Sequence, residues 1–326
     1  MLDSSERRQL YADSFYDVPA QTPRAGIALQ SVRVHSQHIP LDIEEELLGG
    51  AKQVLCAVEA EVSLRAEQRG IHMSRIEQAF QDDHRRPLAA TAMAIGEKIC
   101  ETQGQDSARV SLRTLVPIVT ITPVTALASP DMVEISAVAV AGARPSITQS
   151  VGTTIITACP CMQGYALTEL VNELGLTAVD GLRVLGRVPI ATHSQKGRAT
   201  LTVRAPDLAD LPGYRTLYRA LADHTVLTQE LLKRPDEYEL VRRAHLRPQF
   251  VEDVARDTAA GLARRLLATG RDLRRLTIHV LADSYESIHG HDIQAVLEMT
   301  ADRLVALTED ESGQPQRSTA AEDGSA

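Results

Sequence analysis

The chain has 326 residues, of which 44% are hydrophobic and 24% are charged, so it is long enough for two ordinary domains that each bury a core. A net charge of −9, with 3% aromatic residues and no tryptophan, argues against a groove that binds nucleic acid. The sequence has no run of about 18 apolar residues and no apolar segment behind a basic start, which predicts a cytoplasmic protein without a membrane span.

Four cysteines are too few for the dense disulfide framework of a small secreted domain. Cys56 and Cys100 lie in segments of periodic apolar residues. Free thiols are therefore expected.

Both ends of the chain are polar, which predicts a flexible arm at 1–26 and a disordered tail at 309–326. A first module is predicted at 27–145. Its strands follow from period-two alternation and from enrichment in Val, Ile and Thr, and its helices follow from apolar residues at helical spacing. The predicted strands are 27–38, 52–64, 107–122 and 131–142, and the predicted helices are 74–80 and 87–103.

A second module is predicted at 146–308, with the same order of elements but no visible sequence identity to the first. Its predicted strands are 146–158, 197–205, 274–285 and 289–300, and its predicted helices are 211–233 and 248–270. An insert at about 165–190 is predicted to form a helix followed by a short extended piece. Two ββααββ modules with helices on one face of antiparallel strands define an α+β fold, and exposed strand edges predict closure through oligomerisation.

Cys159 and Cys161 flank a single proline directly after the strand predicted at 146–158. A lone Cys-Pro-Cys is more often a tight bend with buried thiols than a site. Zinc knuckles usually separate their cysteines by two to four residues, and the sequence has no second pair, so a structural site of four thiolates is excluded. Any metal bound here must also draw on histidines and carboxylates.

His289 and His291 are two residues apart, so both side chains share a face if they open a strand. That spacing suits a metal or proton-transfer site, and an exposed polar turn around Gly290 explains it equally well. His193 precedes the strand predicted at 197–205. A single histidine in a polar loop is more often solvated than functional.

Two acidic segments complete the candidates. Pro235 is predicted to end a helix, which leaves Glu237 in a connection that is free to aim its carboxylate inward. Glu252 lies in the first turn of a predicted helix, where the helix dipole alone favours a carboxylate. The neighbouring Asp236 and Asp253 are not distinguished from them by the sequence.

Six segments, taken together, resemble the type IB GTP cyclohydrolase family, including its archaeal branch that feeds methanopterin synthesis. They are RGIHMSR, TACPC, ATHSQKGRATLTV, LLKRPDE, FVEDVARD and ESIHGH, and they occur in the order of that family over roughly residues 27 to 308. The insert before ATHSQKG resembles the archaeal branch more than the shorter bacterial form.

The resemblance implies a tunnelling fold, in which two tandem ββααββ modules per chain assemble into β-barrels within a homotetramer, with active sites at subunit interfaces. It also implies GTP and water as substrates: water adds at C8, formate is released, and the product rearranges to a dihydroneopterin phosphate. One divalent metal per site, Zn2+, Fe2+ or Mn2+, is the implied cofactor.

By position, the resemblance implies that Cys159, Glu237 and His289 are metal ligands and that His193 is a ligand or a proton-transfer group. Cys159 and His193 would thus act in catalysis as well as in metal binding. This set of donors fits the chemistry, because C8 is a weak electrophile and a metal lowers the pKa of its bound water. Thiolate, imidazole and carboxylate ligands leave a coordination position open for that water.

His291 would be the catalytic acid or base of the same site, since a nearby imidazole can move protons during ring opening and loss of formate. Glu252 would anchor the guanine, because one carboxylate accepts hydrogen bonds from both N1–H and the 2-amino group. Cys161 is interpreted as a neighbour of Cys159 on the turn, outside the ligand set. The triphosphate needs cations, and the candidates near these segments are Arg75, Lys196, Arg198, Lys233 and Arg234.

The chain departs from the family pattern beside the site. Gly290 stands where the family commonly has Asn, Asp292 where it has a small polar residue, and Met162-Gln163-Gly164 follow the Cys-Pro-Cys. No implied ligand is lost, so catalysis is expected to survive, with product, substrate or rate open to change.

The first functional hypothesis is a GTP cyclohydrolase that gives 7,8-dihydroneopterin triphosphate. The archaeal-type alternative gives 7,8-dihydroneopterin 2′,3′-cyclic phosphate by the same chemistry at C8. Two other classes are less consistent with the sequence. One is a non-catalytic member that binds a purine or pterin, which the presence of every implied ligand disfavours, and the other is a thiol-nucleophile relative acting on a nitrile or pterin. The latter requires Cys159 to be free of metal, and the matching positions of His289 and Glu237 argue against it.

Overall fold

The computed structural model describes residues 3–13, 17–81, 85–190 and 192–312. Parts of the predicted arm (1–2 and 14–16) and of the predicted tail (313–326) lie outside these ranges. The first part of the arm contains helix α1, Ser4–Asp13. No helix in the described ranges combines the length and apolar character that a membrane span needs.

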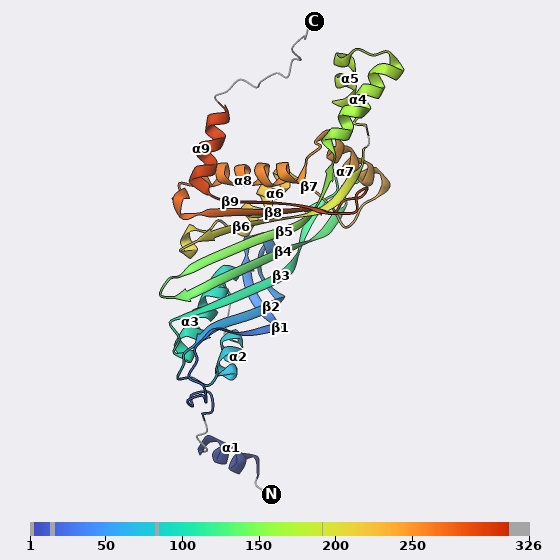
Figure 1. Cartoon of the computed structure of the whole chain (residues 1–326). Coiled ribbons are helices and arrows are strands. Elements are labelled where there is room, and N and C mark those ends of the chain that lie inside the picture. The colour runs from blue at the N-terminus through green and yellow to red at the C-terminus, as the bar shows by residue number, and fades with distance from the viewer. Residues whose placement is uncertain (1–2, 14–16, 82–84, 191, 313–326) are drawn as a thin grey trace.

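One antiparallel sheet organises the described chain (Figure 1). Its order is β1-β2-β3-β4-β5-β6-β8-β9, and the short β7 pairs with β5. The strands are β1 Leu29–Glu45, β2 Gly50–Leu64, β3 Ser107–Ile121, β4 Ala128–Gly142, β5 Ser146–Ala158, β6 Ser194–Ala205, β7 Val226–Leu227, β8 Thr277–Ser284 and β9 Ile293–Thr300. Because β4 pairs with β5, both halves of the chain share this sheet.

Helices cover one face of the sheet, and the predicted α+β class is confirmed. Helix α3 packs on β3 and β4, α6 on β5 and β6, and α8 on β8 and β9, and one apolar core runs beneath them. The helices are α2 Met73–Gln81, α3 Leu88–Gln103, α4 Pro160–Leu174, α5 Ala178–Leu185, α6 Tyr214–His224, α7 Arg234–Leu246, α8 Val251–Leu267 and α9 Ala301–Ser312, with short 3-10 turns η1 Glu46–Leu48, η2 Leu208–Asp210 and η3 Leu273–Arg275.

The opposite face of the sheet carries ion pairs between strands, together with exposed apolar side chains that include Leu55, Leu115 and Val119. The pairs are Arg33–Glu61 at 2.9 Å, Arg198–Glu134 at 3.2 Å and Arg204–Glu298 at 3.2 Å. Arg198 reaches over Gly152, where a Cβ would lie 2.6 Å from its guanidinium. Alternating strands therefore bury one set of apolar side chains under the helices and leave a mixed set of charged and apolar side chains on the other face. Closure of this sheet into barrels with other copies stays a prediction.

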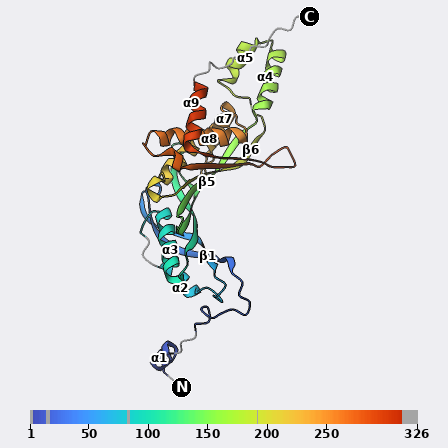
Figure 2. The ribbon, with the colours of Figure 1, turned by 60° about the vertical axis from the view of Figure 1, so that its left-hand side comes forward.

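The predicted insert forms two helices, and the expected extended piece is wrong. Thr177 caps α5 by accepting a hydrogen bond from the Asp180 amide at 3.1 Å, a pattern that starts a helix. Gly181 of α5 is buried against Leu167 and Val171 of α4. Figures 1 and 2 show this pair of helices projecting beyond the end of the sheet.

Several other predicted boundaries differ, among them the end of β1, which runs on to Glu45 instead of ending at 38. Pro235 does not end a helix but lies in the first turn of α7, where its missing N–H costs no helical hydrogen bond. The helix predicted at 211–233 ends at His224, and β7 follows it. Helix α9 crosses the predicted start of the tail. In each case the local apolar pattern did not show where tertiary contacts end the element.

Glu45 joins the end of β1 to the start of α3. Its carboxylate is 6% exposed and accepts a hydrogen bond of 2.7 Å from the backbone N–H of Leu88. Burial raises the pKa of Glu45 to about 7, although the hydrogen bond from Leu88 opposes the shift. The folded chain therefore holds a proton on Glu45 that the unfolded chain releases near pH 4.5.

The Glu45→Gln variant should remove this proton linkage while its amide oxygen still accepts the Leu88 N–H. Stabilisation by protonated Glu45 is complete below about pH 4.5 and is lost as the pH rises through about 7. The free energy of unfolding of Glu45→Gln relative to the natural chain should therefore rise by up to about 3 kcal/mol between about pH 4.5 and pH 8. Urea unfolding at several pH values measures this free energy, with Glu44→Gln at an exposed position as the matched control variant. The same change of unfolding free energy with pH in both variants would contradict the prediction.

Candidate active site

Three segments that are distant in sequence meet at one end of the sheet. Cys159 follows β5 and His193 precedes β6, and the pairing of Ala158 with Ser194 puts them opposite each other. The Cys159 N–H donates to the His193 carbonyl oxygen at 3.3 Å. The Tyr285 N–H donates to the carbonyl oxygen of Lys196 at 2.9 Å, so the loop between β8 and β9 starts beside β6.

The structure brings His193, His289 and His291 together. The ring centroids of His193 and His289 are 6.2 Å apart with an edge-to-face geometry, and those of His289 and His291 are 5.3 Å apart and stacked. The two later histidines do not open a strand, because β9 begins at Ile293. They lie in a loop, and the fold of that loop, rather than strand alternation, puts their rings side by side.

The loop that carries His289 and His291 is held at its base. The Glu286 N–H donates to the Asp292 carboxylate at 3.0 Å, and the Glu286 carboxylate accepts hydrogen bonds from Ser284 at 2.8 Å and Gln195 at 3.2 Å. Asp292, one of the departures from the family pattern, thus closes the loop. At Gly290, by contrast, a Cβ would meet open space, so packing does not require glycine there.

One polar atom in this cluster lacks a partner among the described residues: the buried Nδ1 of His193. A buried ring nitrogen without a hydrogen bond is costly, and a metal ion or a proton partner would satisfy it. Imidazole and thiol donors are those that Zn2+ and Fe2+ prefer. The donor types present therefore suit a divalent metal.

The two predicted glutamates are not part of this cluster. Glu237 and Glu252 lie exposed in the first turns of α7 and α8. Helix α7 packs through Ala244 and Leu240 against Ala158, which precedes Cys159. Across the described ranges, no three His, Cys, Asp or Glu side chains are grouped closely enough to hold a metal. One chain by itself thus does not complete the predicted ligand set.

His245 near the end of α7 connects α7 to the segment before His193 and to α4, and nothing in the sequence indicated this role. It is 3% exposed, and its ring nitrogens lie 2.8 Å from the Val241 carbonyl oxygen and 3.2 Å from that of Thr192. The Gln163 amide on α4 donates to the His245 carbonyl oxygen. A histidine within a polar helical sequence gives no signal of such long-range contacts.

The candidate cations separate by position. Arg75 donates to the Thr102 carbonyl oxygen at 2.9 Å, in the first half of the chain. Arg198 is engaged with Glu134 on the polar face of the sheet. The remaining three, Lys196, Lys233 and Arg234, are exposed near the segments that carry the predicted site.

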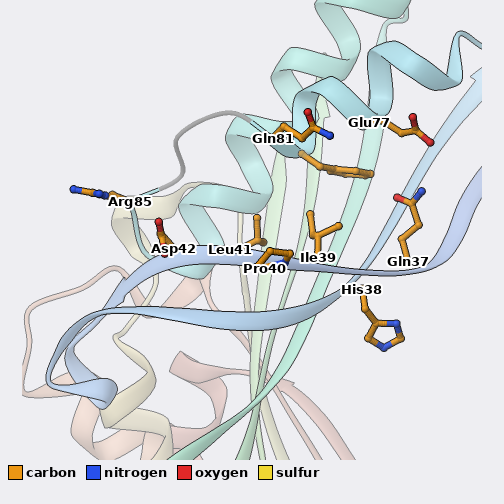
Figure 3. A pocket seen from close by; sticks show the side chains of 10 residues that line it. Gln37, His38, Ile39, Pro40, Leu41, Asp42, Glu77, Gln81 and Arg85 are labelled. Atoms are coloured by element: carbon orange, nitrogen blue, oxygen red, sulfur yellow. The ribbon is translucent and has the colours of Figure 1, made fainter.

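A separate concavity of about 740 Å³ lies between β1 and α2 (Figure 3). Ile39, Leu41 and Phe80 supply apolar lining, and Asp42 and Glu77 lie among its polar side chains. It adjoins the β1 edge of the sheet, whereas the histidine cluster lies by β6 and β8. The concavity is therefore not the predicted site.

Fold and site together define an α+β protein with a candidate active site of three histidines and a cysteine at strand ends. The family described as type I GTP cyclohydrolase folE2 matches residues 15–295, and the chain belongs to this family.

Relatives with two names match most of the chain. GTP cyclohydrolase MptA 2 of Methanocella arvoryzae is 30% identical over 74% of this chain and 82% of that protein. GTP cyclohydrolase MptA of Haloferax volcanii is 29% identical over 88% of this chain and 96% of its own length. GTP cyclohydrolase FolE2 of Dictyoglomus thermophilum is 27% identical over 86% of this chain and 97% of its own length.

The Gly197→Ala variant tests how closely β6 and β8 must approach beneath the histidine loop. A Cβ at Gly197 would collide with the Asp283 backbone oxygen and lie 3.2 Å from Ile155. Because backbone cannot yield as a flexible side chain does, we expect a loss of about 1–3 kcal/mol of stability. Gly164→Ala on α4, where a Cβ meets nothing within 4 Å, should instead be neutral or stabilising by about 1 kcal/mol. Thermal unfolding measures the stability of both variants relative to the natural chain. Equal changes in stability for Gly197→Ala and Gly164→Ala would contradict the packing argument.

Proposed function

We propose that this chain is a metal-dependent GTP cyclohydrolase that hydrolyses GTP at C8, releases formate and gives 7,8-dihydroneopterin triphosphate. The observation that carries the proposal is the cluster of His193, His289 and His291 beside Cys159, in a chain whose residues 15–295 match a GTP cyclohydrolase family.

The donors for the metal would be the Cys159 sulfur, ring nitrogens of His193 and His289, and a Glu237 carboxylate oxygen. When bound, Zn2+, Fe2+ or Mn2+ would supply the Lewis acidity that makes water a nucleophile near neutral pH. The partnerless Nδ1 of His193 supports its place in this set. In this proposal His193 is a metal ligand or a proton-transfer group beside the metal.

His291 would move protons during the reaction. Its ring stacks on that of His289, so it lies one ring away from the proposed ligand set. An imidazole can both accept and donate a proton, so it can take a proton from the attacking water and return one to the ring nitrogen that leaves C8.

Glu252 would select the purine. Its exposed carboxylate in the first turn of α8 can accept hydrogen bonds from N1–H and the 2-amino group of guanine, a pair that adenine lacks. Lys196, Lys233 and Arg234 would contact the triphosphate. Lys233 and Arg234 lie at the start of α7, where the helix dipole also favours an anion.

A homo-oligomer, with four copies as the family resemblance implies, would complete the site in cytoplasmic solution. In support, Glu237 stands apart from the histidine cluster in one chain, and β1 and β9 end the sheet with outer edges that pair with no other strand in the described ranges. Residues from a neighbouring copy could then meet those of this chain.

The second candidate is the archaeal-type cyclohydrolase that gives 7,8-dihydroneopterin 2′,3′-cyclic phosphate. The observation that favours it is the name MptA, carried by the relatives from Methanocella and Haloferax. The candidates share the chemistry at C8 and differ in the fate of the triphosphate.

Anaerobic incubation of metal-reconstituted protein with GTP tests both candidates. Mass spectrometry should find formate together with a triphosphate product for the first candidate, or with a cyclic phosphate for the second. ATP serves as the control substrate, which a carboxylate that reads guanine should reject. Absence of formate with each of Zn2+, Fe2+ and Mn2+ would refute the cyclohydrolase activity and favour a non-catalytic purine- or pterin-binding role.

Cys159→Ala tests the ligand assignment. Turnover and metal content should fall together, because the thiolate is proposed to hold the metal rather than to attack the substrate. Cys161→Ala removes an exposed thiol two residues away and should keep most of the metal. Loss of activity with full metal content in Cys159→Ala would instead indicate a thiol nucleophile.

A further inference from the structure

Asp236, which the sequence did not distinguish from its neighbour Glu237, is buried and bound to a distant turn. Its side chain is 0% exposed. Its Oδ1 accepts hydrogen bonds from the backbone N–H groups of Val124 and Thr125 at 2.9 and 3.0 Å, and its Oδ2 accepts one from the Thr125 hydroxyl at 2.5 Å. These groups lie in the turn between β3 and β4, more than one hundred residues earlier in the chain.

A plain helix cap does not account for this arrangement. The one local hydrogen bond, from the Lys233 N–H, is long at 3.4 Å. Asp253 occupies the same third position of α8 and shows what a local cap looks like: it accepts from the Phe250 N–H at 3.1 Å and from Arg256 at 3.2 Å, within its own helix start. Three of these four hydrogen bonds to Asp236 therefore come from the β3–β4 turn and only one comes from its own helix start.

The segment before α7 is bound to the same region a second time. The Glu230 N–H donates to the Asp131 carboxylate at 2.8 Å, and the Leu231 N–H donates to the Ser129 hydroxyl at 3.0 Å. Both partners lie at the start of β4. The path into α7 is thus fixed along its length to the β3–β4 hairpin.

The turn that receives Asp236 is held in an unfavourable conformation. Ala126 has φ of 52°, in the left-handed region that residues with a Cβ seldom adopt. The Thr122 hydroxyl accepts the Leu127 N–H at 2.9 Å and lies 3.0 Å from the Thr125 hydroxyl. Such strain persists where surrounding contacts determine the backbone, and it concentrates at functional sites.

Helix α7 is therefore bound at both ends. Asp236 holds its first turn to the β3–β4 turn, and His245 holds its last turn to Thr192, the residue before His193. A helix is stiff, so these two attachments fix the position of Glu237 relative to the histidine cluster.

We propose that Asp236 is a positioning residue of the active site: by binding Val124 and Thr125 it holds α7 where the Glu237 carboxylate can join the metal site of the assembled homo-oligomer. This inference rests on the proposed role of Glu237 as a ligand. None of the hydrogen bonds that Asp236 accepts in the described chain comes from a proposed metal ligand, so Asp236 would change metal affinity only through the position of α7, as supporting contacts around metal ligands do.

Asp236→Asn, Thr125→Val and their double variant test the inference, with Asp253→Asn as the matched control. Metal affinity is measured with Mn2+ or Zn2+ alone by competition with a chelator. Asp236→Asn should weaken metal binding about tenfold to a hundredfold, because the amide cannot accept all three hydrogen bonds. Thr125→Val should weaken it less, and the double variant should lose less than the product of the two effects. Asp253→Asn should leave metal affinity unchanged.

Turnover and amide exchange separate positioning from general damage. In Asp236→Asn, kcat should fall at limiting metal and recover at saturating metal, since Glu237 is still present, while KM for GTP stays the same. The Val124 and Thr125 amides should exchange with solvent faster. Unchanged metal affinity in Asp236→Asn, or an equal loss in Asp253→Asn, would overturn the inference.

Two measurements distinguish failure of this inference from failure of the proposed function. Natural protein that binds metal but yields no formate would refute the cyclohydrolase activity, and the metal affinities would still decide the role of Asp236. Glu237→Gln with the metal affinity of the natural chain would remove Glu237 from the ligand set and would overturn the inference even where formate is produced.

Discussion

The antiparallel pairing of β5 with β6 is the constraint on which the candidate site depends. It sets Cys159 against His193 at the end of twelve paired positions, and β8 then pairs with the other edge of β6. A shift of one residue would turn each of these strands over and remove its apolar side chains from the core. The core therefore fixes the register, and the register fixes which polar residues emerge together where the strands end.

The division of the sheet into two faces follows from the same alternation. One face carries the apolar residues that α3, α6 and α8 cover, and the other carries the ion pairs that cross from strand to strand. Exposed ion pairs add little stability, and exposed apolar side chains such as Leu115 and Val119 lie on the same face as these charges. The buried apolar face stabilises the fold, and the residues of the candidate active site lie where the strands end.

Much of this could be predicted from the sequence, because strand patterns are local. The strand expected at 146–158 is β5, and that expected at 107–122 is one residue longer than β3. The segments that carry the site could also be identified, because their residue types and order resemble a known family. Both the alternation within a strand and the spacing within a motif can be recognised from residues that are close in the sequence.

What the sequence did not reveal depends on contacts between distant residues. The roles of Asp236 and His245 arise from partners 111 and 53 residues away, and nothing in their local sequence indicates them. The start of α7 was misplaced for a related reason: Pro235 was weighed as a helix breaker, although the first turn tolerates proline. The stacking of His289 on His291 comes from the Glu286–Asp292 bond that closes their loop, not from strand alternation.

The exposed positions of Glu237, His289 and His291 bear on how the site could work. Charges in contact with bulk water interact weakly, so a metal held by these side chains in one open chain would be poorly protected and weakly activating. Chemistry at a carbon as unreactive as C8 needs water excluded except for the reacting molecule. In the proposed homo-oligomer a second copy would supply this cover, because the outer edges of β1 and β9 pair with no other strand in the described ranges and can accept its strands. In that proposed assembly, an added copy would both cover the open site and pair with the free strand edges.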